Sequence, residues 1–250
     1  MATDNAAISG APARKGAALI TGSAKRIGRA ISLALAGKGY DIALHHHSSR
    51  RDAELARNEI ESLGRRCSIF PCDLNHLEAS TSLPSAVFEV FPECNLLINN
   101  ASIFEPGRLM NTDEQILDCH FTVNFKSPFF LSREFARHCK KENIINILAS
   151  RTAGADTEHF AYTLTKKALL EFTKMAARDL APHIRVNGVC PGFISPPAGK
   201  DESYSEHKSN ALPIKRTGGP ENLASAVLFL VDNYFITGES LYIDGGEHIQ

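Results

Sequence analysis

The sequence lacks several features that mark other classes of protein. No apolar run among its 250 residues approaches the length of a membrane span, so a membrane protein is not expected. The 27 basic and 28 acidic residues nearly cancel, and neither a nucleic-acid surface nor a polybasic membrane anchor is indicated. The six cysteines show no paired metal-ligand spacing and no dense disulfide pattern. This cysteine usage fits a reducing, cytoplasmic setting.

The N-terminal residues also lack the apolar segment of a signal peptide. Residues 1–15 are small and polar, and we expect them to form a flexible tail. Residues 16–250 contain no internal repeat, low-complexity segment or recognisable linker. We therefore expect a single domain over residues 16–250.

What the chain does contain is an alternation of apolar strands and helices. Strands are predicted at 17–20, 40–47, 66–74, 94–101, 144–148, 184–189 and 240–243, and helices around 31–35, 55–63, 77–90, 113–139, 160–180 and 220–230. This alternation predicts an α/β fold: one doubly wound Rossmann-type domain with a mainly parallel sheet covered by helices on both faces. Residues 193–217, rich in Pro, Ser, Lys and Glu, are predicted to form a loop that closes over the substrate.

The stretch from Ala17 to Arg29 is typical of a strand, a sharp turn and the start of a helix. Gly22 can adopt backbone angles that a side chain forbids, and Gly28 allows a close approach of backbone or ligand. A turn that opens a helix presents free N–H groups and the positive end of the helix dipole, which suit a pyrophosphate. Such a turn also occurs in a purely structural role, so the motif alone leaves both interpretations open.

The end of the second predicted strand indicates which nicotinamide cofactor binds. An NAD site usually has an acid there, on the ribose 2′-hydroxyl. Here the strand ends in His47-Ser48-Ser49-Arg50, with Lys25 and Arg26 close in sequence. Hydroxyls and cations favour a 2′-phosphate, whereas a carboxylate would repel it. The sequence therefore predicts NADPH/NADP+ rather than NAD(H).

Three successive histidines, residues 45–47, raise the question of a metal site. In a strand, His45 and His47 share one face, but no Cys, Asp or Glu is evidently placed to complete a set of ligands. We expect no bound metal. We expect these histidines to line the adenosine pocket or to cap the strand.

A tyrosine and a lysine four residues apart indicate a reacting centre. Tyr162 and Lys166 lie on one face of a predicted helix, so both side chains reach the same cleft. We expect the ammonium to lower the pKa of the phenol, which makes Tyr162 a better proton donor and acceptor. Alone, this pair is common on exposed helices.

Taken together, these residues resemble the short-chain dehydrogenase/reductase family over residues 16–248. The matching pieces are Thr21-Gly22 with Gly28, Asp73, Asn99-Asn100-Ala101, Asn124, Tyr162 with Lys166, Pro191-Gly192, Thr237-Gly238 and Asp244-Gly245-Gly246. The resemblance implies that Lys166 also holds the nicotinamide ribose, that Asn124 supports a proton relay, and that the chain forms a homotetramer. It places Asp73 and Asn100 along the adenosine side of the cofactor.

The residues predicted to act in catalysis are thus Tyr162, Lys166 and Asn124. The residues predicted to bind the cofactor are Thr21, Gly22, Lys25, Arg26, Ile27, Gly28, His47, Ser48, Ser49, Asp73, Leu74, Asn100, Ala101, Ser102, Tyr162, Lys166, Pro191 and Gly192.

Within this family, residues 21–29, 44–48 and 99–104 resemble pteridine reductases. In that branch the arginine matching Arg26 reaches both the cofactor phosphate and the pterin. The residues matching Ser102 and Phe104 line the pterin site, with the aromatic ring stacked on the substrate opposite the nicotinamide. Stacking on Phe104 would contribute on the order of 1 kcal/mol. The alternative for Phe104 is ordinary packing at the end of a strand.

Ala149 departs from the family pattern. Most members have a catalytic serine there, and pteridine reductases have an aspartate that binds the pterin and assists proton transfer. A methyl group neither donates nor accepts a hydrogen bond. Ser150 can replace the missing group only if the strand has already ended, because adjacent strand residues face opposite sides. Arg151 is a further source of charge.

The sequence predicts an NADPH-dependent reductase of pteridines, with dihydropterin or dihydrofolate-like substrates and Tyr162 as the proton donor. The predicted substrate-binding residues are Arg26, Ser102, Phe104, Ser150 and Tyr162. One alternative is an NADPH-dependent carbonyl reductase for a ketone, sugar or acyl-carrier substrate, which needs an oxyanion partner beside Tyr162. The other is a catalytically weak NADP(H)-binding protein.

Overall fold

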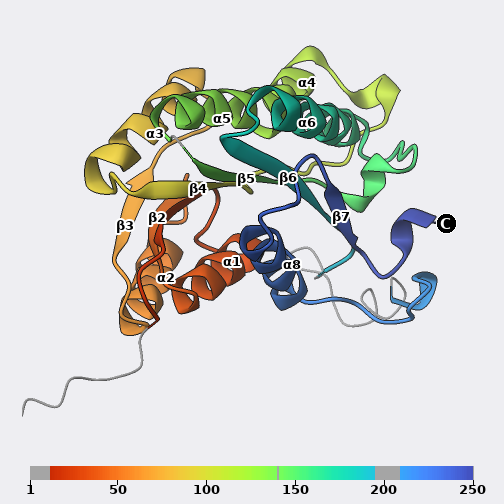
Figure 1. The fold of residues 1–250 in the computed structure, drawn as a ribbon. Helices are drawn as coiled ribbons and strands as arrows, with labels where there is room; N and C mark the ends of the chain where they lie inside the picture. The colour runs from red at the N-terminus through yellow and green to blue at the C-terminus, as the bar shows by residue number, and fades with distance from the viewer. Residues whose placement is uncertain (1–11, 140, 195–208, 250) are drawn as a thin grey trace, which may run out of the picture.

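The computed structural model describes residues 12–139, 141–194 and 209–249, and shows one α/β domain built on a parallel sheet (Figure 1). The strands are β1 (Gly16–Ile20), β2 (Tyr40–His46), β3 (Cys67–Pro71), β4 (Cys94–Asn99), β5 (Glu142–Ile147), β6 (Ile184–Pro191) and β7 (Ser240–Ile243). Their order across the sheet is β3-β2-β1-β4-β5-β6-β7, and neighbouring strands are parallel throughout. The predicted doubly wound fold is confirmed.

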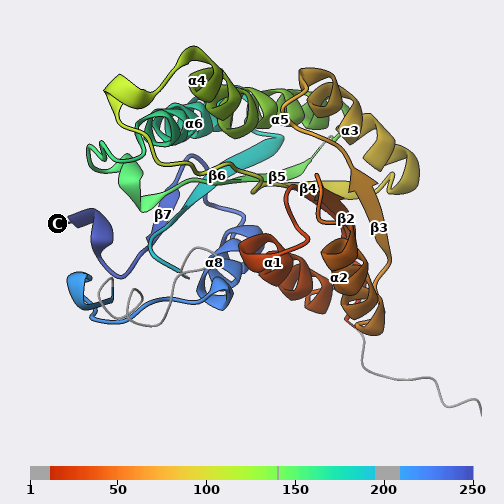
Figure 2. The ribbon, with the colours of Figure 1, turned by 180° about the vertical axis from the view of Figure 1, so that it is seen from behind.

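Helices cover both faces of this sheet (Figures 1 and 2). One face carries α1 (Arg26–Gly37), α2 (Arg50–Ser62) and α8 (Pro220–Asp232), and the other carries α3 (Leu77–Val90), α4 (Glu114–Phe121), α5 (Ser127–His138) and α6 (Phe160–Asp179). In β1, Leu19 packs into the core that contains Phe135, whereas Ile20 packs into the core that contains Ile31. Because strand side chains alternate between faces, a strand covered on both sides needs the continuous apolar run that β1 has.

Local sequence signals set where several helices begin. Asp113 caps α4, since its Oδ1 accepts a hydrogen bond from the backbone N–H of Ile116 at 2.8 Å. Pro128 lies in the first turn of α5 and Pro220 opens α8. Proline suits the first turn of a helix because its missing N–H would have no partner there.

The single regular helix predicted over 113–139 is wrong at its centre. After α4 the chain forms a π-helical turn, Thr122–Lys126, before it continues as α5. A π turn winds more residues per turn than an α-helix, which an apolar pattern with a helical period does not reveal. Asn124 lies within this turn and is fully buried.

The sheet changes direction of winding between β1 and β4, where β2 and β3 lie to one side and β4 to β7 to the other. The crevice at the carboxyl ends of the strands beside such a switch point is where ligands bind in open α/β sheets. β2 ends at His46 and β4 at Asn99, both earlier than predicted. His47 and Asn100 therefore lie in the loops that border the crevice.

Two predicted segments are described only in part. Of the predicted tail 1–15, residues 1–11 lie outside the described residues, and Arg14 forms ion pairs with Asp41 and Glu93. Of the predicted loop 193–217, residues 195–208 lie outside them, and residues 209–211 are helical. Within the described ranges, the helices lack the combination of length and apolar character that crossing a membrane requires.

Candidate active site

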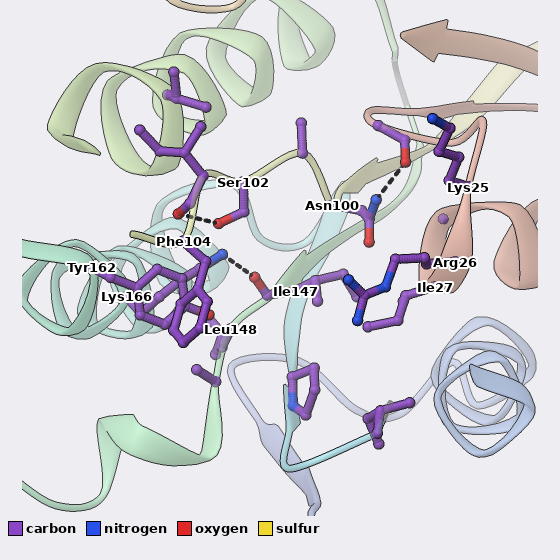
Figure 3. Close-up of a pocket in the computed structure, with 18 of the residues that line it drawn as sticks. Lys25, Arg26, Ile27, Asn100, Ser102, Phe104, Ile147, Leu148, Tyr162 and Lys166 are labelled. Carbon is purple, nitrogen blue, oxygen red and sulfur yellow. Dashed lines mark hydrogen bonds between the residues drawn. The ribbon is translucent and has the colours of Figure 1, made fainter. Parts of the chain in front are cut away.

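A cavity of about 590 Å³ opens at the carboxyl ends of the strands, beside the switch point (Figure 3). Figure 3 shows Lys25, Arg26 and Ile27 on one side and Phe104, Tyr162 and Lys166 on the other. The predicted site residues that line it are Gly22, Lys25, Arg26, Ile27, Gly28, His47, Asp73, Leu74, Asn100, Ala101, Ser102, Phe104, Ser150, Tyr162, Lys166, Pro191 and Gly192. The predicted site residues Thr21, Ser48, Ser49 and Asn124 do not line it.

The turn between β1 and α1 is held by hydrogen bonds to the loop after β4. Asn100 Nδ2 donates to the carbonyl oxygens of Thr21 and Gly22 at 2.8 and 3.0 Å. The Thr21 hydroxyl is buried and accepts from the backbone N–H groups of Asn100 and Ala101. A Cβ on Gly28 would lie 2.3 Å from the Gly22 carbonyl oxygen, so only glycine permits this packing. Thr21 therefore shapes the turn from behind the cavity wall.

Two cations of this turn lie at the cavity. Arg26 has a φ of 49°, in the left-handed region that favours glycine, which agrees with its place at the usual middle glycine of the turn. Lys25 forms an ion pair with Asp52 at 3.0 Å, and both side chains are about half exposed. His47 Nε2 lies 3.7 Å from Asp73 Oδ2 across the same rim.

His45 is buried between the turn and the end of β3. Its Nδ1 accepts from the Gly22 N–H at 3.1 Å, so Nε2 carries the proton and donates to the Cys72 carbonyl oxygen at 3.1 Å. The pKa of His45 is lowered to about 4, mainly by burial and also by the neighbouring His46 and His47, while the hydrogen bond to Cys72 opposes the decrease. Within the described part of the chain no group of three or more His, Cys, Asp or Glu side chains is arranged to hold a metal ion.

Tyr162 and Lys166 reach the cavity from the first turns of α6, as their spacing predicts. The Lys166 ammonium donates to the Ile147 carbonyl oxygen at 2.7 Å and lies 5.7 Å from the centre of the Tyr162 ring. Burial lowers the pKa of Lys166 to about 8.

The predicted decrease of the Tyr162 pKa is wrong for this state of the protein. Burial raises the pKa of Tyr162 well above its ordinary value, and the positive charge of Arg151 only partly opposes this effect. The charged form of a group deprived of water is disfavoured, and Lys166, itself buried, is bonded to a carbonyl oxygen instead of the phenol.

Asn124 holds the loop that forms the cavity wall. Its Oδ1 accepts from the Ile103 N–H at 2.9 Å and from the Ser102 hydroxyl at 3.0 Å, and its Nδ2 donates to the Ile103 carbonyl oxygen at 3.0 Å. The π-helical turn directs the amide at this loop. The part of Asn124 in a proton relay stays a prediction.

Phe104 is about half exposed and lies against the start of α6. Its ring stacks on the His159 ring, with centroids 4.2 Å apart, and contacts the Tyr162 ring edge-on at 4.7 Å. The Arg151 guanidinium lies 5.6 Å from the Phe104 centroid and forms an ion pair with Asp156. An aromatic ring and a cation thus border the cavity beside Tyr162.

The strand before Ala149 has ended, which meets the condition for a role of Ser150. β5 ends at Ile147, and Ser150 begins the short helix η3 (Ser150–Thr152). Ser150 lines the cavity, and its hydroxyl donates to Glu247 Oε2 at 2.9 Å.

Sequence reasoning missed Glu247, although it lines the cavity. It opens the short helix η4 (Glu247–Ile249), directly after Asp244-Gly245-Gly246. The two glycines have φ values of 65° and 87°, which turn the chain back toward the strand ends. An acid that follows such a glycine pair after the last strand is the signal that could have identified it.

Comparison with known proteins places this geometry in a family. The family model described as Enoyl-(Acyl carrier protein) reductase matches residues 22–248. The oxidoreductase YjdA of Bacillus subtilis is 33% identical, with 92% of this chain and 95% of that protein covered. The 3-oxoacyl-[acyl-carrier-protein] reductase FabG of Staphylococcus aureus is 30% identical, with 93% and 98% covered.

The structure of FolM alternative dihydrofolate reductase 1 from Brucella canis, complexed with NADP, has a TM-score of 0.88 to this chain. It is 31% identical, and 94% of this chain and 95% of that chain are covered. The family match covers most of the chain, the sheet is parallel throughout, and the Tyr162–Lys166 pair on α6 lines the cavity. These observations support the same family assignment. The chain belongs to the short-chain dehydrogenase/reductase family of NAD(P)-dependent oxidoreductases.

Proposed function

We propose that this protein is an NADPH-dependent reductase of pteridines. The observation that carries the proposal is that one cavity is bordered by Tyr162, by the Phe104 ring beside it, and by Arg26 on the far side. The likeness to the Brucella canis protein, named as a dihydrofolate reductase, supports the same substrate class.

The residues at the turn fit a dinucleotide with a phosphorylated ribose. Gly22 and Gly28 keep side chains out of the space at the start of α1, where backbone N–H groups bind a pyrophosphate. Lys25 and Arg26 line the cavity and supply positive charge. Lys25 forms an ion pair with Asp52 at 3.0 Å. When bound, NADPH supplies a hydride to the carbon of a C=N bond.

Tyr162 is the proton donor in this proposal. Burial holds Tyr162 in its protonated form, and transfer of that proton to the ring nitrogen requires a neighbouring positive charge that lowers the pKa of the phenol toward working pH. Lys166 lies beneath the ring, where its ammonium stabilises the negative charge left on the phenol oxygen. Both groups are tied to α6, which keeps them in register.

Phe104 and Arg26 suit a flat heterocycle. A ring held against Phe104 gains stacking energy on the order of 1 kcal/mol. A guanidinium donates in a fixed plane to ring nitrogen or carbonyl oxygen. Stacking on Phe104 requires a free face, and His159 already covers one face of the ring at 4.2 Å. The substrate therefore takes the face turned to the cavity.

Reduction of a carbonyl is the second candidate, favoured by the likeness to FabG. A saturated ketone needs a hydrogen-bond donor for its developing oxyanion. Ala149 offers none, and the Ser150 hydroxyl donates its single proton to Glu247. These two residues favour the pteridine over the ketone.

The test is NADPH oxidation by the purified protein with dihydrobiopterin and dihydrofolate beside a panel of ketones and an acetoacetyl thioester. We expect turnover on the pterins, its loss in Tyr162→Phe, and a KM for the pterin raised about fivefold in Phe104→Ala. The matched control, Phe235→Ala, removes an exposed ring at the surface. Turnover on ketones alone would establish the second candidate. NADPH binding without turnover would establish a binding protein.

The assembly and the location are further predictions. The homotetramer implied by the family resemblance is tested by light scattering of the full chain, and a monomer would contradict it. The cytoplasmic setting is tested by cell fractionation.

A further inference from the structure

A carboxylate reaches the cavity from the segment that follows the last strand, β7. Glu247 stands at the start of η4, after β7, and lines the cavity together with Ser150 and Arg151. Its Oε2 accepts a hydrogen bond from the Ser150 hydroxyl at 2.9 Å. Ser150 is buried and Glu247 is partly buried, and both line the cavity, so the pair forms part of its wall.

The fold holds Glu247 in place through its neighbours. The buried side chain of Asp244 accepts hydrogen bonds from the backbone N–H groups of Gly246 and His248 at 3.0 and 2.8 Å, and lies 2.8 Å from His248 Nδ1. The Tyr242 ring stacks on His248 with centroids 4.2 Å apart. These contacts fix the turn from which the carboxylate projects.

Gly192, at the end of β6, leaves the space that the carboxylate occupies. A Cβ at this position would lie 2.5 Å from Asp244 Cβ and 2.8 Å from Glu247 Oε2, so Gly192 makes room for both Asp244 and the carboxylate. Gly192 itself lines the cavity. The carboxylate is thus accommodated by glycine on one side and bonded to Ser150 on the other.

Among the residues that the structure describes, Glu247 forms no ion pair with a cationic side chain. Arg151, the cation that shares this wall, forms its ion pair with Asp156 instead. A partly buried carboxylate without a cation is costly unless N–H donors satisfy it.

The Ser150–Glu247 pair therefore presents acceptors to the cavity. Serine has one proton, and it is used inside the pair, so the hydroxyl lone pairs and the second carboxylate oxygen remain to accept. Two adjacent N–H groups on one edge of a flat ligand match a carboxylate with two parallel charge-assisted hydrogen bonds. An oxyanion or a thioester carbonyl would instead meet negative charge.

We propose that Glu247, held by Ser150, binds the amino and ring N–H edge of the substrate heterocycle and so selects aminopyrimidine-type rings over ketones. This proposal rests on the proposed pteridine reduction and names the contact that sets its specificity. Glu247 supplies from the turn after β7 the carboxylate that Ala149, after β5, cannot supply.

The test measures, by calorimetry, how tightly the NADP+-loaded protein binds pterin and the pterin analogue that lacks the exocyclic amino group. The wild type is expected to bind pterin about tenfold more tightly than the analogue, the effect of one hydrogen bond to a charged group. Glu247→Gln is expected to bind both ligands equally. Glu247→Ala serves as a second variant, and NADP+ affinity reports that each variant is folded.

The matched control is Glu105→Gln, which removes one exposed carboxylate near Phe104 without touching the cavity lining. The control is expected to keep the wild-type preference. A wild type that binds both ligands equally, or a preference that survives in both Glu247 variants, would overturn the proposal.

Failure of this contact is distinguishable from failure of the proposed function. If the wild type and Glu247→Gln both reduce dihydrobiopterin with the same KM and both keep the ligand preference, the role of Glu247 is refuted while pteridine reduction stands. If the wild type reduces no pterin, pteridine reduction is refuted, and the binding preference alone decides the role of Glu247.

Discussion

His45 makes the stability of the turn between β1 and α1 depend on pH. Its ring accepts from the Gly22 N–H and donates to the Cys72 carbonyl oxygen, which is possible only for the neutral form. Protonation would place a second N–H against the Gly22 N–H and leave both donors without an acceptor. Acidification should therefore destabilise the folded protein through this one side chain.

The magnitude follows from the pKa of His45, which burial lowers from 6.5 to about 4. Between these values the unfolded chain binds a proton that the native chain does not, so the stabilisation is fully present above about pH 6.5 and is lost as the pH falls to about 4. The full difference amounts to about 3 kcal/mol. Between about pH 8 and about pH 5 the expected loss is about 2 kcal/mol.

The assay is urea unfolding of the wild type and of His45→Asn at these two pH values. Asparagine keeps an acceptor near the Gly22 N–H but does not titrate, so the fall in unfolding free energy between the two pH values should be about 2 kcal/mol smaller in the variant. Ser23→Ala is the matched control. It removes the hydroxyl that bonds Ile20 and His45 carbonyl oxygens, and should lower stability equally at both pH values. A wild-type pH dependence in His45→Asn would refute the assignment.

Three further predictions concern the same site. Arg26→Gly should be more stable than Arg26→Ala by about 1 kcal/mol in urea unfolding, because only glycine relieves the φ of 49°; equal stability would show that the turn carries no strain. Gly28→Ala should lose at least about 1 kcal/mol and most NADPH affinity, since its Cβ would meet a backbone oxygen, whereas Gly37→Ala, with open space around its Cβ, should lose neither. NADPH affinity of the free protein should fall above about pH 8 as Lys166 loses its proton, and a fall that persists in Lys166→Met would assign it to another group.

The sequence by itself determined the fold and most of the residues that line the cavity. Continuous apolar runs such as β1 predict buried parallel strands, and parallel strands place their carboxyl ends at one edge. Residues at or directly after those ends, such as Pro191 and Asn100, therefore had to meet at one cavity. The Tyr162–Lys166 pair was equally predictable, because residues four positions apart lie on the same face of a helix.

Only the tertiary structure decided what these side chains contact. The Tyr162 pKa moves opposite to the prediction because burial outweighs the charge of a lysine that bonds a backbone carbonyl. Ser48 and Ser49 follow β2 but do not line the cavity. Glu247 lies 97 positions after Ser150 along the chain, and only the packing of η4 beside β6 brings the two together. Local patterns specify which elements form, whereas burial and contacts between distant segments depend on how those elements pack.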